Sequence, residues 1–416
     1  MAGDSIQPAP GRAETIAVAA SSLFLFAAPF AGSAGIRSGG LILAALVIAI
    51  AGLWRTAHKR VPLALAATIA SWFLLTALSL AWSTDPQLTL EELRAESLYG
   101  FLAFAVFFTL ATDARRWRVW WFALIAGTLL TLAAREFQQV TGVTLWMAPP
   151  DGGVGAFSTH LVLIAPLLVA LAWNTPWGIR RSAGLLACSL LVLIVAAWTT
   201  RESWTTPNRI IWPALGAAFV AAIIAGRSAA GFPADALPGL RRVIAITGIA
   251  IVVAFVASIA AKSERFYHGD PRFAASVEHD IRPRLWTVGL ERWKDAPWLG
   301  HGFGREILGS AFLPETPSGG DHPEVRHAHN AFLNIALQLG IIGLVVFVAV
   351  LAALAREYVA LLAQPAAAVL GLIGLALLAG FVTKNLTDDF LHRHNAQVFW
   401  ALNGMLLGFA ARMRGG

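Results

Sequence analysis

The stretch RHAHNAFLNIALQLGIIGLVVFVAVLAALA, residues 326–355, decides the fold class of this chain. It opens with an arginine, two histidines and an asparagine. It then continues as an apolar run that is long enough to cross a bilayer as a helix, for which about 20 residues are needed. Polar groups at the entrance of such a helix need hydrogen-bond partners or water. The stretch therefore predicts a membrane-spanning helix, and it raises the question of what its histidines do.

The composition of the whole chain supports the same class. Of its 416 residues, 57% are hydrophobic and only 13% are charged, which is far more apolar than a soluble protein of this length. Long apolar runs recur along nearly the whole chain, and this pattern favours helices over barrel strands. The net charge of +7 is spread over short clusters between these runs, where basic residues act as topology signals. We therefore expect no nucleic-acid partner.

We expect an all-α polytopic membrane protein with about 12 transmembrane helices. The expected organisation is one integrated membrane domain, with spans 1–9 in residues 1–261, a large loop in 262–328 and spans 10–12 in 329–416. The predicted spans are 14–33, 39–54, 62–82, 96–112, 117–134, 157–174, 182–198, 208–226, 242–261, 329–355, 360–384 and 394–411.

Basic clusters on alternate connections predict that both termini are cytoplasmic and that the loop 262–328 lies on the outer side. A loop this long is more often functional than not. Part of it should be helical, because apolar residues recur at helical spacing in RPRLWTVGLERWKD, residues 282–295. Pro283 suits the first turn of this helix, and Pro297 lies beyond its end.

His329 is the first candidate for chemistry. If the helix starts at this histidine, Gly340 lies eleven residues on, which is only about 20° from a whole number of turns, and Gly343 lies nearby. Asn330, Gly340 and Gly343 would then form a packing motif that locks His329 against another span. The alternative is that His327 and His329 are interfacial groups hydrogen-bonded to water.

Two further borders hold candidate residues. Arg209 begins an apolar span after Arg201, and Arg282 begins the loop helix; a guanidinium suits an anionic headgroup, although snorkelling at the interface explains such arginines as well. The segment NLTDDFLHRHN, residues 385–395, is a rival site that contains Asp388, Asp389, His392 and His394.

We expect no metal ion and no cofactor. DHPEVRHAHN, residues 321–330, holds possible zinc ligands, but Pro323 interrupts it and its histidines are not spaced as a helical ligand pair. GHGFG, residues 300–304, lacks the lysine and the context of a nucleotide-binding loop.

Several segments resemble the superfamily of O-antigen ligases, O-antigen polymerases and protein O-oligosaccharyltransferases. The histidine motif of this superfamily reads HNAFLNIALQLGIIG here, from His329 to Gly343. RPRLW followed by APWLGHGFG is similar to its loop arginine and turn, and TTPNRIIW to its upstream arginine segment. GVGAFSTHLVLIAPLL and DDFLHRHNAQVFWALNGMLLG resemble stretches of a middle span and of the ligase ending.

The resemblance implies an O-antigen ligase: a GT-C-type, inverting and metal-independent glycosyltransferase in the bacterial inner membrane, with its active site facing the periplasm. It implies a glycan on undecaprenyl diphosphate as donor and the outer-core sugar of lipid A-core as acceptor. His329 would be the catalytic residue, and Arg209 and Arg282 would bind the diphosphate. Further candidate contacts are Arg265, Arg284, Arg201 and Asp389.

Two alternatives remain. One is a polymerase or a protein O-oligosaccharyltransferase of the same superfamily, because these enzymes share the loop chemistry. The other is a transporter of lipid-linked glycans, which is expected to carry polar residues near the bilayer midplane. In this chain the polar residues crowd at the outer border and in the loop, which favours an enzyme.

Overall fold

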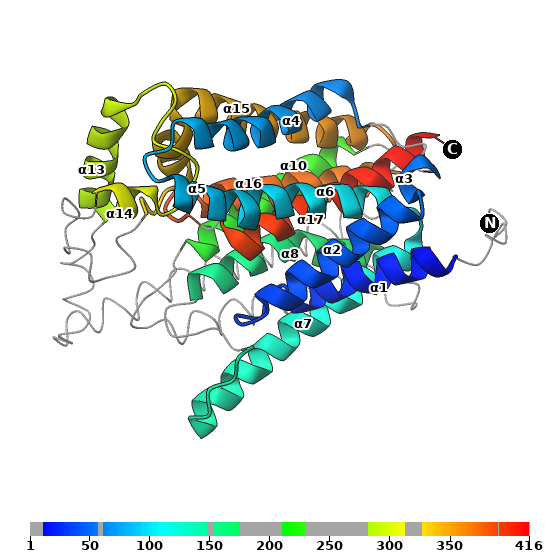
Figure 1. Cartoon of the computed structure of the whole chain (residues 1–416). Helices are drawn as coiled ribbons and strands as arrows, with labels where there is room; N and C mark the ends of the chain where they lie inside the picture. The colour runs from blue at the N-terminus through cyan, green and yellow to red at the C-terminus, as the bar shows by residue number, and fades with distance from the viewer. Residues whose placement is uncertain are drawn as a thin grey trace. The chain divides into compact units, whose positions relative to one another are not determined.

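The computed structural model describes residues 11–56, 61–147, 154–174, 210–229, 282–312, 327–389 and 391–415, and every regular element in these residues is helical (Figure 1). Short 3₁₀ and π segments lie at η1 (Ser79–Ala81) and η2 (Leu93–Leu98). The α-helices are α1 (Arg12–Ala27), α2 (Ala34–Ile50), α3 (Leu53–Thr56), α4 (Leu63–Leu78), α5 (Pro86–Glu92), α6 (Tyr99–Leu110), α7 (Ala114–Thr141), α8 (Val154–Asn174), α10 (Ile211–Ser228), α13 (Arg282–Asp295), α14 (Ile307–Phe312), α15 (Ala331–Leu362), α16 (Ala368–Lys384) and α17 (Arg393–Gly415).

The chain divides into two compact units. The first unit consists of Met1–Arg60, Tyr99–Pro149 and Gln397–Gly416. The second unit consists of Val61–Leu98 and Pro150–Ala396, and it holds every described residue of the candidate site.

In the first unit, α1 packs against α2 and α7. Small residues permit this close packing. A Cβ atom added at Gly127 of α7 would lie 2.0 Å from the carbonyl oxygen of Phe26, and one added at Gly404 of α17 would lie 2.4 Å from that of Phe104. Glycines at helix contacts of this kind are typical of membrane proteins, where backbones approach closely because lipid gives apolar side chains no reason to cluster.

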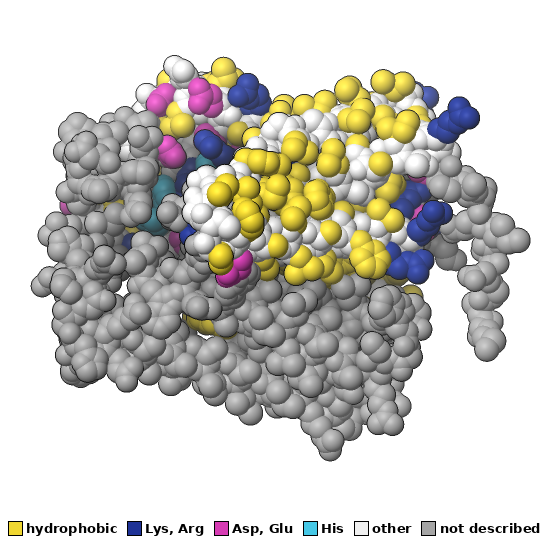
Figure 2. Space-filling model, turned by 90° about the horizontal axis from the view of Figure 1, so that it is seen from below, with side chains coloured by type: hydrophobic (Ala, Val, Ile, Leu, Met, Phe, Trp, Pro, Cys, Tyr) yellow, Lys and Arg dark blue, Asp and Glu magenta, His cyan; other side chains and the backbone are white. Residues whose placement is uncertain are grey.

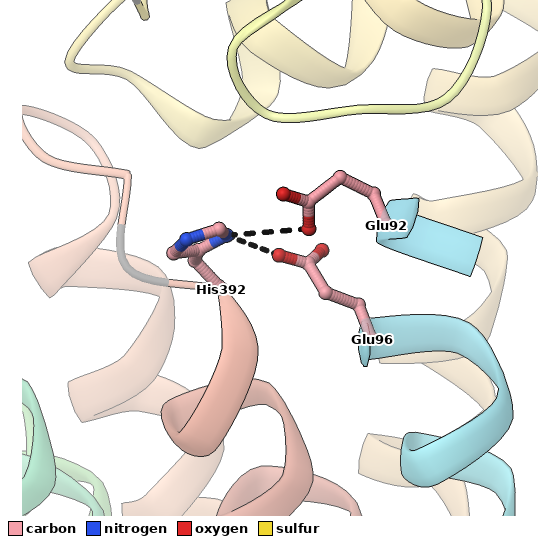
Figure 3. Close-up of side chains that lie close together, drawn as sticks. All are labelled: Glu92, Glu96 and His392. Atoms are coloured by element: carbon pink, nitrogen blue, oxygen red, sulfur yellow. Dashed lines mark hydrogen bonds and ion pairs between the residues drawn. The ribbon is translucent and has the colours of Figure 1, made fainter. Parts of the chain in front are cut away.

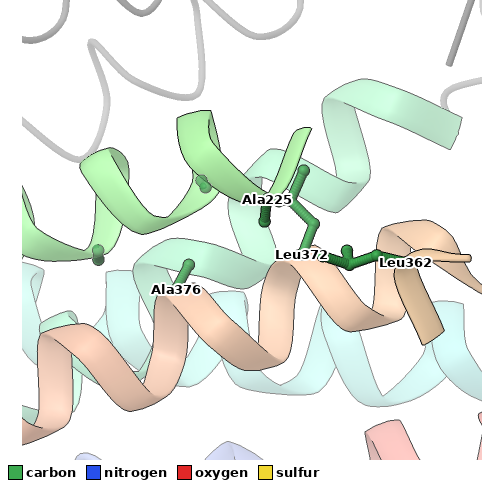
Figure 4. Packing of buried hydrophobic residues seen from close by; sticks show 6 residues of the cluster. Ala225, Leu362, Leu372 and Ala376 are labelled. Carbon is green, nitrogen blue, oxygen red and sulfur yellow. The ribbon is translucent and has the colours of Figure 1, made fainter. Parts of the chain in front are cut away.

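In the second unit, α16 packs against α10, α15 and α8. Figure 4 shows the contact between α10 and α16, where Ala225 lies next to Leu372, with Ala376 further along α16 and Leu362 at the other end of the cluster. The alanines of α10 recur at residues 218, 222 and 225, so they lie on one helix face. This small-residue face brings α16, and the segment that follows it, into a fixed position.

The surface of the helices is apolar. Leu74, Phe122 and Val345 each remain more than half exposed, and Figure 2 shows hydrophobic side chains over the middle of the helices in view, with charged side chains towards their ends. Five helices in the described residues are long and apolar enough to cross a membrane. The protein is therefore a multi-pass membrane protein. The predicted spans 182–198 and 242–261 lie outside the described residues, so the number twelve stays a prediction.

The connection before α6 differs from its prediction. The predicted spans 62–82 and 96–112 leave a connection between them, whereas Pro86–Leu110 is continuously helical through α5, η2 and α6. The reason is an early start signal: the carboxylate of Asp85 accepts from the backbone N–H of Leu88, and Pro86 occupies the first turn. The loop helix α13, in contrast, lies where it was predicted, at Arg282–Asp295.

Candidate functional site

The entrance of α15 is built by Asn330. Its side-chain oxygen accepts from the backbone N–H of Leu333 at 3.0 Å and caps the helix, which begins at Ala331. His329 precedes the cap and has a φ of 48°, in the left-handed region that a histidine rarely adopts. The turn, rather than a helix, therefore holds the His329 side chain in place.

The predicted register between His329 and the two glycines is wrong. His329 lies outside the helix, and Gly340, with φ 65° and ψ −167°, breaks it. What packs against the break is not another span but the loop turn that contains Trp298. A Cβ atom at Gly340 would lie 2.2 Å from the carbonyl carbon of Trp298, while one at Gly343 would meet the Leu339 side chain of the same helix.

Backbone hydrogen bonds join the turn that contains Trp298 to α15 on both sides of the break at Gly340. The N–H groups of His301 and Gly302 donate to the carbonyl oxygens of Leu337 and Gln338, each at 2.9 Å. On the other side of the break, the N–H of Ile341 donates to the carbonyl oxygen of Pro297 at 2.8 Å. These bonds satisfy peptide groups that the break removes from the helix, which water cannot do inside a membrane. The break at Gly340 thus fixes the loop turn to α15, the helix that begins two residues after His329.

The rival site and the histidine border form a single site. After α16, the chain brings Asp388 beside His329, with 3.9 Å between the carboxylate Oδ1 and the ring Nδ1. The backbone N–H of Ala331 donates to the Asp388 carbonyl oxygen at 3.0 Å. The other carboxylate oxygen of Asp388 accepts from Lys384 at 2.5 Å, and both side chains of this ion pair are buried. Asp388 therefore links the last turn of α16 to the entrance of α15.

Asp389 has different partners. Its carboxylate accepts from the side-chain amide of Asn334 at 2.6 Å and lies 3.7 Å from Nε of Arg305. Burial raises the pKa of Asp389 to about 6, and the Arg305 guanidinium opposes this rise. Sequence analysis named Asp389 among the further candidate contacts. The structure places it against Arg305, while Asp388 is the carboxylate beside His329.

His327 is packed beside His329, with 4.1 Å between the ring centroids. Nη2 of Arg305 donates to Nε2 of His327 at 2.6 Å, since a guanidinium can only donate. Burial, followed by repulsion from Arg305, lowers the pKa of His327 well below its ordinary value, and Arg282 adds to this effect. His327 is therefore a neutral, buried ring that supports the site rather than a solvated loop residue.

The first turn of α13 contributes Arg282, which is half-buried. The helix is held next to α15: the indole N–H of Trp286 donates to the carbonyl oxygen of Ala328 at 2.8 Å, and Leu285 is fully buried against the start of α15. Arg282 therefore lies close enough to the histidine border to contribute to the lowered pKa of His327. Arg284 lies in the same helix, and the predicted residues Arg209, Arg201 and Arg265 lie outside the described residues.

Sequence analysis did not select Arg305 or Lys384. Arg305 directly follows the turn APWLGHGFG, and Lys384 is a lysine at the end of an apolar run, so both had a local signal. A cation at such a border is as readily explained by snorkelling, and only the buried partners Asp388 and Asp389 show that these two belong to the site.

A second polar cluster lies in the same unit (Figure 3). Nδ1 of His392 is in hydrogen-bond contact with Glu96 and lies 3.8 Å from Oε2 of Glu92. The backbone N–H of Arg393 donates to Glu96 at 3.1 Å. Burial, together with repulsion from Arg305, lowers the pKa of His392 to about 3, so its ring is neutral near pH 7. His392 was named in sequence analysis only as part of the rival site, and its glutamate partners were not.

Apolar helices long enough to cross a bilayer, with a buried site of histidines, arginines and aspartates at the entrance of one of them, define a multi-pass membrane protein with a border site. A comparison with protein-family models shows which family part of the chain resembles. Residues 155–348 match the family model described as O-antigen ligase, and this match supports the superfamily that the motifs indicated. The match includes His329 and ends beyond the break in α15. None of the curated proteins compared with the chain matches it.

Proposed function

We propose that the protein is an O-antigen ligase, which transfers O-antigen polysaccharide from undecaprenyl diphosphate to the outer-core sugar of lipid A-core. The observation that supports this most strongly is the pair formed by His329 and Asp388 at the entrance of a spanning helix. A carboxylate beside one ring nitrogen orients an imidazole and stabilises its protonated form. With Nδ1 towards Asp388, the other nitrogen, Nε2, is assigned to the acceptor hydroxyl.

The proposed reaction is a single displacement. The acceptor hydroxyl oxygen attacks the anomeric carbon of the donor, and its proton passes to His329. The bond from that carbon to the diphosphate oxygen breaks, and the undecaprenyl diphosphate leaves with the electron pair. Attack from the face opposite the leaving group inverts the anomeric centre. The reaction as proposed uses no metal ion and no cofactor.

Cations would stabilise the leaving diphosphate. Of the candidate arginines, Arg282 lies within the described residues, on α13, which packs next to the histidine border. Arg209 is proposed as its partner in binding the diphosphate. Arg265, Arg284 and Arg201 are proposed as further contacts. Arg305 is assigned a different task, since its guanidinium already contacts His327 and Asp389.

The proposed setting follows from the function. Both substrates are lipid-linked, so the site would open to the outer leaflet of the bacterial inner membrane, with the loop 262–328 on the periplasmic side and both termini in the cytoplasm. Holding two lipid-anchored substrates at one interface supplies part of the rate by orientation. The membrane spans in residues 1–261 and 329–416 would form one membrane domain around the site.

Reconstitution of the purified protein in liposomes tests this function. The donor, a glycan on undecaprenyl diphosphate, is offered with three acceptors in separate reactions: lipid A-core, a second lipid-linked repeat, and a serine-containing pilin-like peptide. We expect a mass increase only for lipid A-core. Growth of the lipid-linked repeat would show a polymerase, and a glycosylated peptide would show a protein O-oligosaccharyltransferase. Movement of the donor across the bilayer without transfer would show a transporter.

A further inference from the structure

The cluster of Glu92, Glu96 and His392 takes no part in the proposed transfer. Each side chain offers one ligand atom, and the three atoms lie within 4.8 Å of one another (Figure 3). The residues come from distant parts of the chain, since 296 positions separate Glu96 from His392. The fold of the second unit therefore assembles this cluster.

The cluster is buried and incompletely satisfied. The side chains of Glu92, Glu96 and His392 are 4%, 7% and 14% exposed. Oε2 of Glu92 points to Nδ1 of His392 at 3.8 Å, which is too long for a hydrogen bond, and it has no hydrogen-bond partner in the described part of the chain. A buried carboxylate oxygen without a donor is unfavourable unless something else binds it.

Backbone geometry sets the direction of the ligands. Glu96 lies in the π-helical segment η2, whose wider turn changes the angle between Glu96 and Glu92. Opposite them, Arg393 has a φ of 43°, and its backbone N–H binds Glu96 at 3.1 Å. Local structure on both sides thus directs the possible ligand atoms of Glu92, Glu96 and His392 towards one point.

We propose that Glu92, Glu96 and His392 bind a divalent transition-metal ion of the zinc type. Two carboxylates this close repel each other in a medium of low polarity, and a divalent cation removes that repulsion. The guanidinium of Arg393 lies 3.9 Å from Glu92 but is 61% exposed, so solvent screens its charge. One imidazole and two carboxylate oxygens are ligands that Zn²⁺ accepts, with a fourth position left for water.

The ion would stabilise the structure around the site and would take no part in the reaction. It would tie α5 and η2 to the residue that precedes α17. Arg305, which contacts Asp389 and His327, also lies close enough to repel a charge on His392, so the cluster and the histidine site share this arginine. Mg²⁺ should bind less well, because it prefers oxygen ligands and retains water.

The test measures metal binding by the full-length protein in detergent, carrying a tag without histidine. After treatment with a chelator and its removal, Zn²⁺, Mn²⁺ or Mg²⁺ is titrated, and the bound metal is counted by elemental analysis. We expect one Zn²⁺ per chain, with Mg²⁺ the weakest binder. Glu96→Gln and Glu92→Gln should each weaken Zn²⁺ binding by about tenfold or more. Glu91→Gln is the matched control, because Glu91 is an exposed neighbour on the same helix, and it should bind like the wild type.

X-ray absorption at the zinc edge keeps the test decisive if a variant fails to fold. The wild-type protein should show nitrogen and oxygen ligands at about 2.0 Å with the scattering of a single imidazole. Failure of the wild type to bind one Zn²⁺ overturns the proposal. So does equal binding by Glu96→Gln and Glu91→Gln. Loss of the metal in His322→Gln instead, a variant in the 321–330 segment of possible zinc ligands, also overturns it. None of these outcomes depends on transfer activity, so they leave the proposed ligase function standing.

Discussion

His329 and His392 occupy similar places but have opposite surroundings. Each precedes a long helix, and each belongs to a turn with a positive φ, at His329 itself and at Arg393 after His392. His329 has one carboxylate at 3.9 Å, and arginines reach its neighbour His327. His392 has two glutamates beside one ring nitrogen, Nδ1. In our two proposals, the same side chain would therefore accept a proton beside an anionic substrate at one border and bind a cation at the other.

Among the variants that test this comparison, Asp388→Asn should cause the largest loss of stability, because it leaves Lys384 buried without its carboxylate. Breaking a buried ion pair costs about 3–5 kcal/mol, so thermal unfolding in detergent should shift strongly downwards. The double variant Lys384→Met, Asp388→Leu removes both charges and should recover most of the stability. It should not recover glycan transfer, since His329 still lacks its carboxylate. A double variant that transfers at the wild-type rate would show that Asp388 serves the fold alone.

Gly340→Ala tests whether the break in α15 fixes the histidine border. A side chain there meets both a φ of 65° and the Trp298 carbonyl group, and we expect a loss of about 2–4 kcal/mol. Gly216→Ala in α10 is the control, because an added Cβ there meets nothing within 4 Å. It should be neutral or stabilise by about 0.5–1 kcal/mol. Equal melting temperatures for the two variants would contradict the role of the break.

His327→Gln should change how stability depends on pH. The pKa of His327 is lower in the folded chain than in the unfolded chain. Below about pH 6.5 the unfolded chain therefore binds a proton that the folded chain rejects, and folding loses stability as the pH falls. Melting curves from pH 8 to pH 5 should fall more steeply for the wild type than for the variant. Parallel curves would show that His327 is exposed to solvent.

Asn330→Ala should have the smallest effect. It removes the cap of α15, and the loss should be about 1 kcal/mol. Asn330→Ser keeps an oxygen that can accept from Leu333 and should retain most of that stability. If the two variants lose equal stability, the cap is not what holds the entrance of the helix.

Much of the border site was predictable from local sequence. The apolar run after His329 predicted α15, and the spacing of Leu285, Gly289 and Trp293 predicted α13, because both signals lie within one helix. The break at Gly340 was missed, since a glycine in an apolar run is equally consistent with close helix packing and with a left-handed residue. Only the position of the Trp298 turn decides between them.

The contacts between distant segments were not predictable. Asp388 lies 59 residues after His329, and the two were treated as belonging to rival sites until the packing of α16 brought them together. The cluster of Glu92, Glu96 and His392 had no sequence signal, because its parts are nearly 300 residues apart. Side chains of this kind are joined by tertiary packing alone.

The central claim is that His329 accepts the proton of the attacking hydroxyl. It is tested most directly with His329→Asn, since asparagine tolerates a positive φ and preserves the turn. Donor binding and the rate of glycan transfer to lipid A-core are measured on the same reconstituted protein. We predict that the variant binds the donor like the wild type but transfers about 100-fold to 10,000-fold more slowly. Transfer within about tenfold of the wild-type rate, a smaller loss than proton transfer by a side chain supplies, would contradict the account.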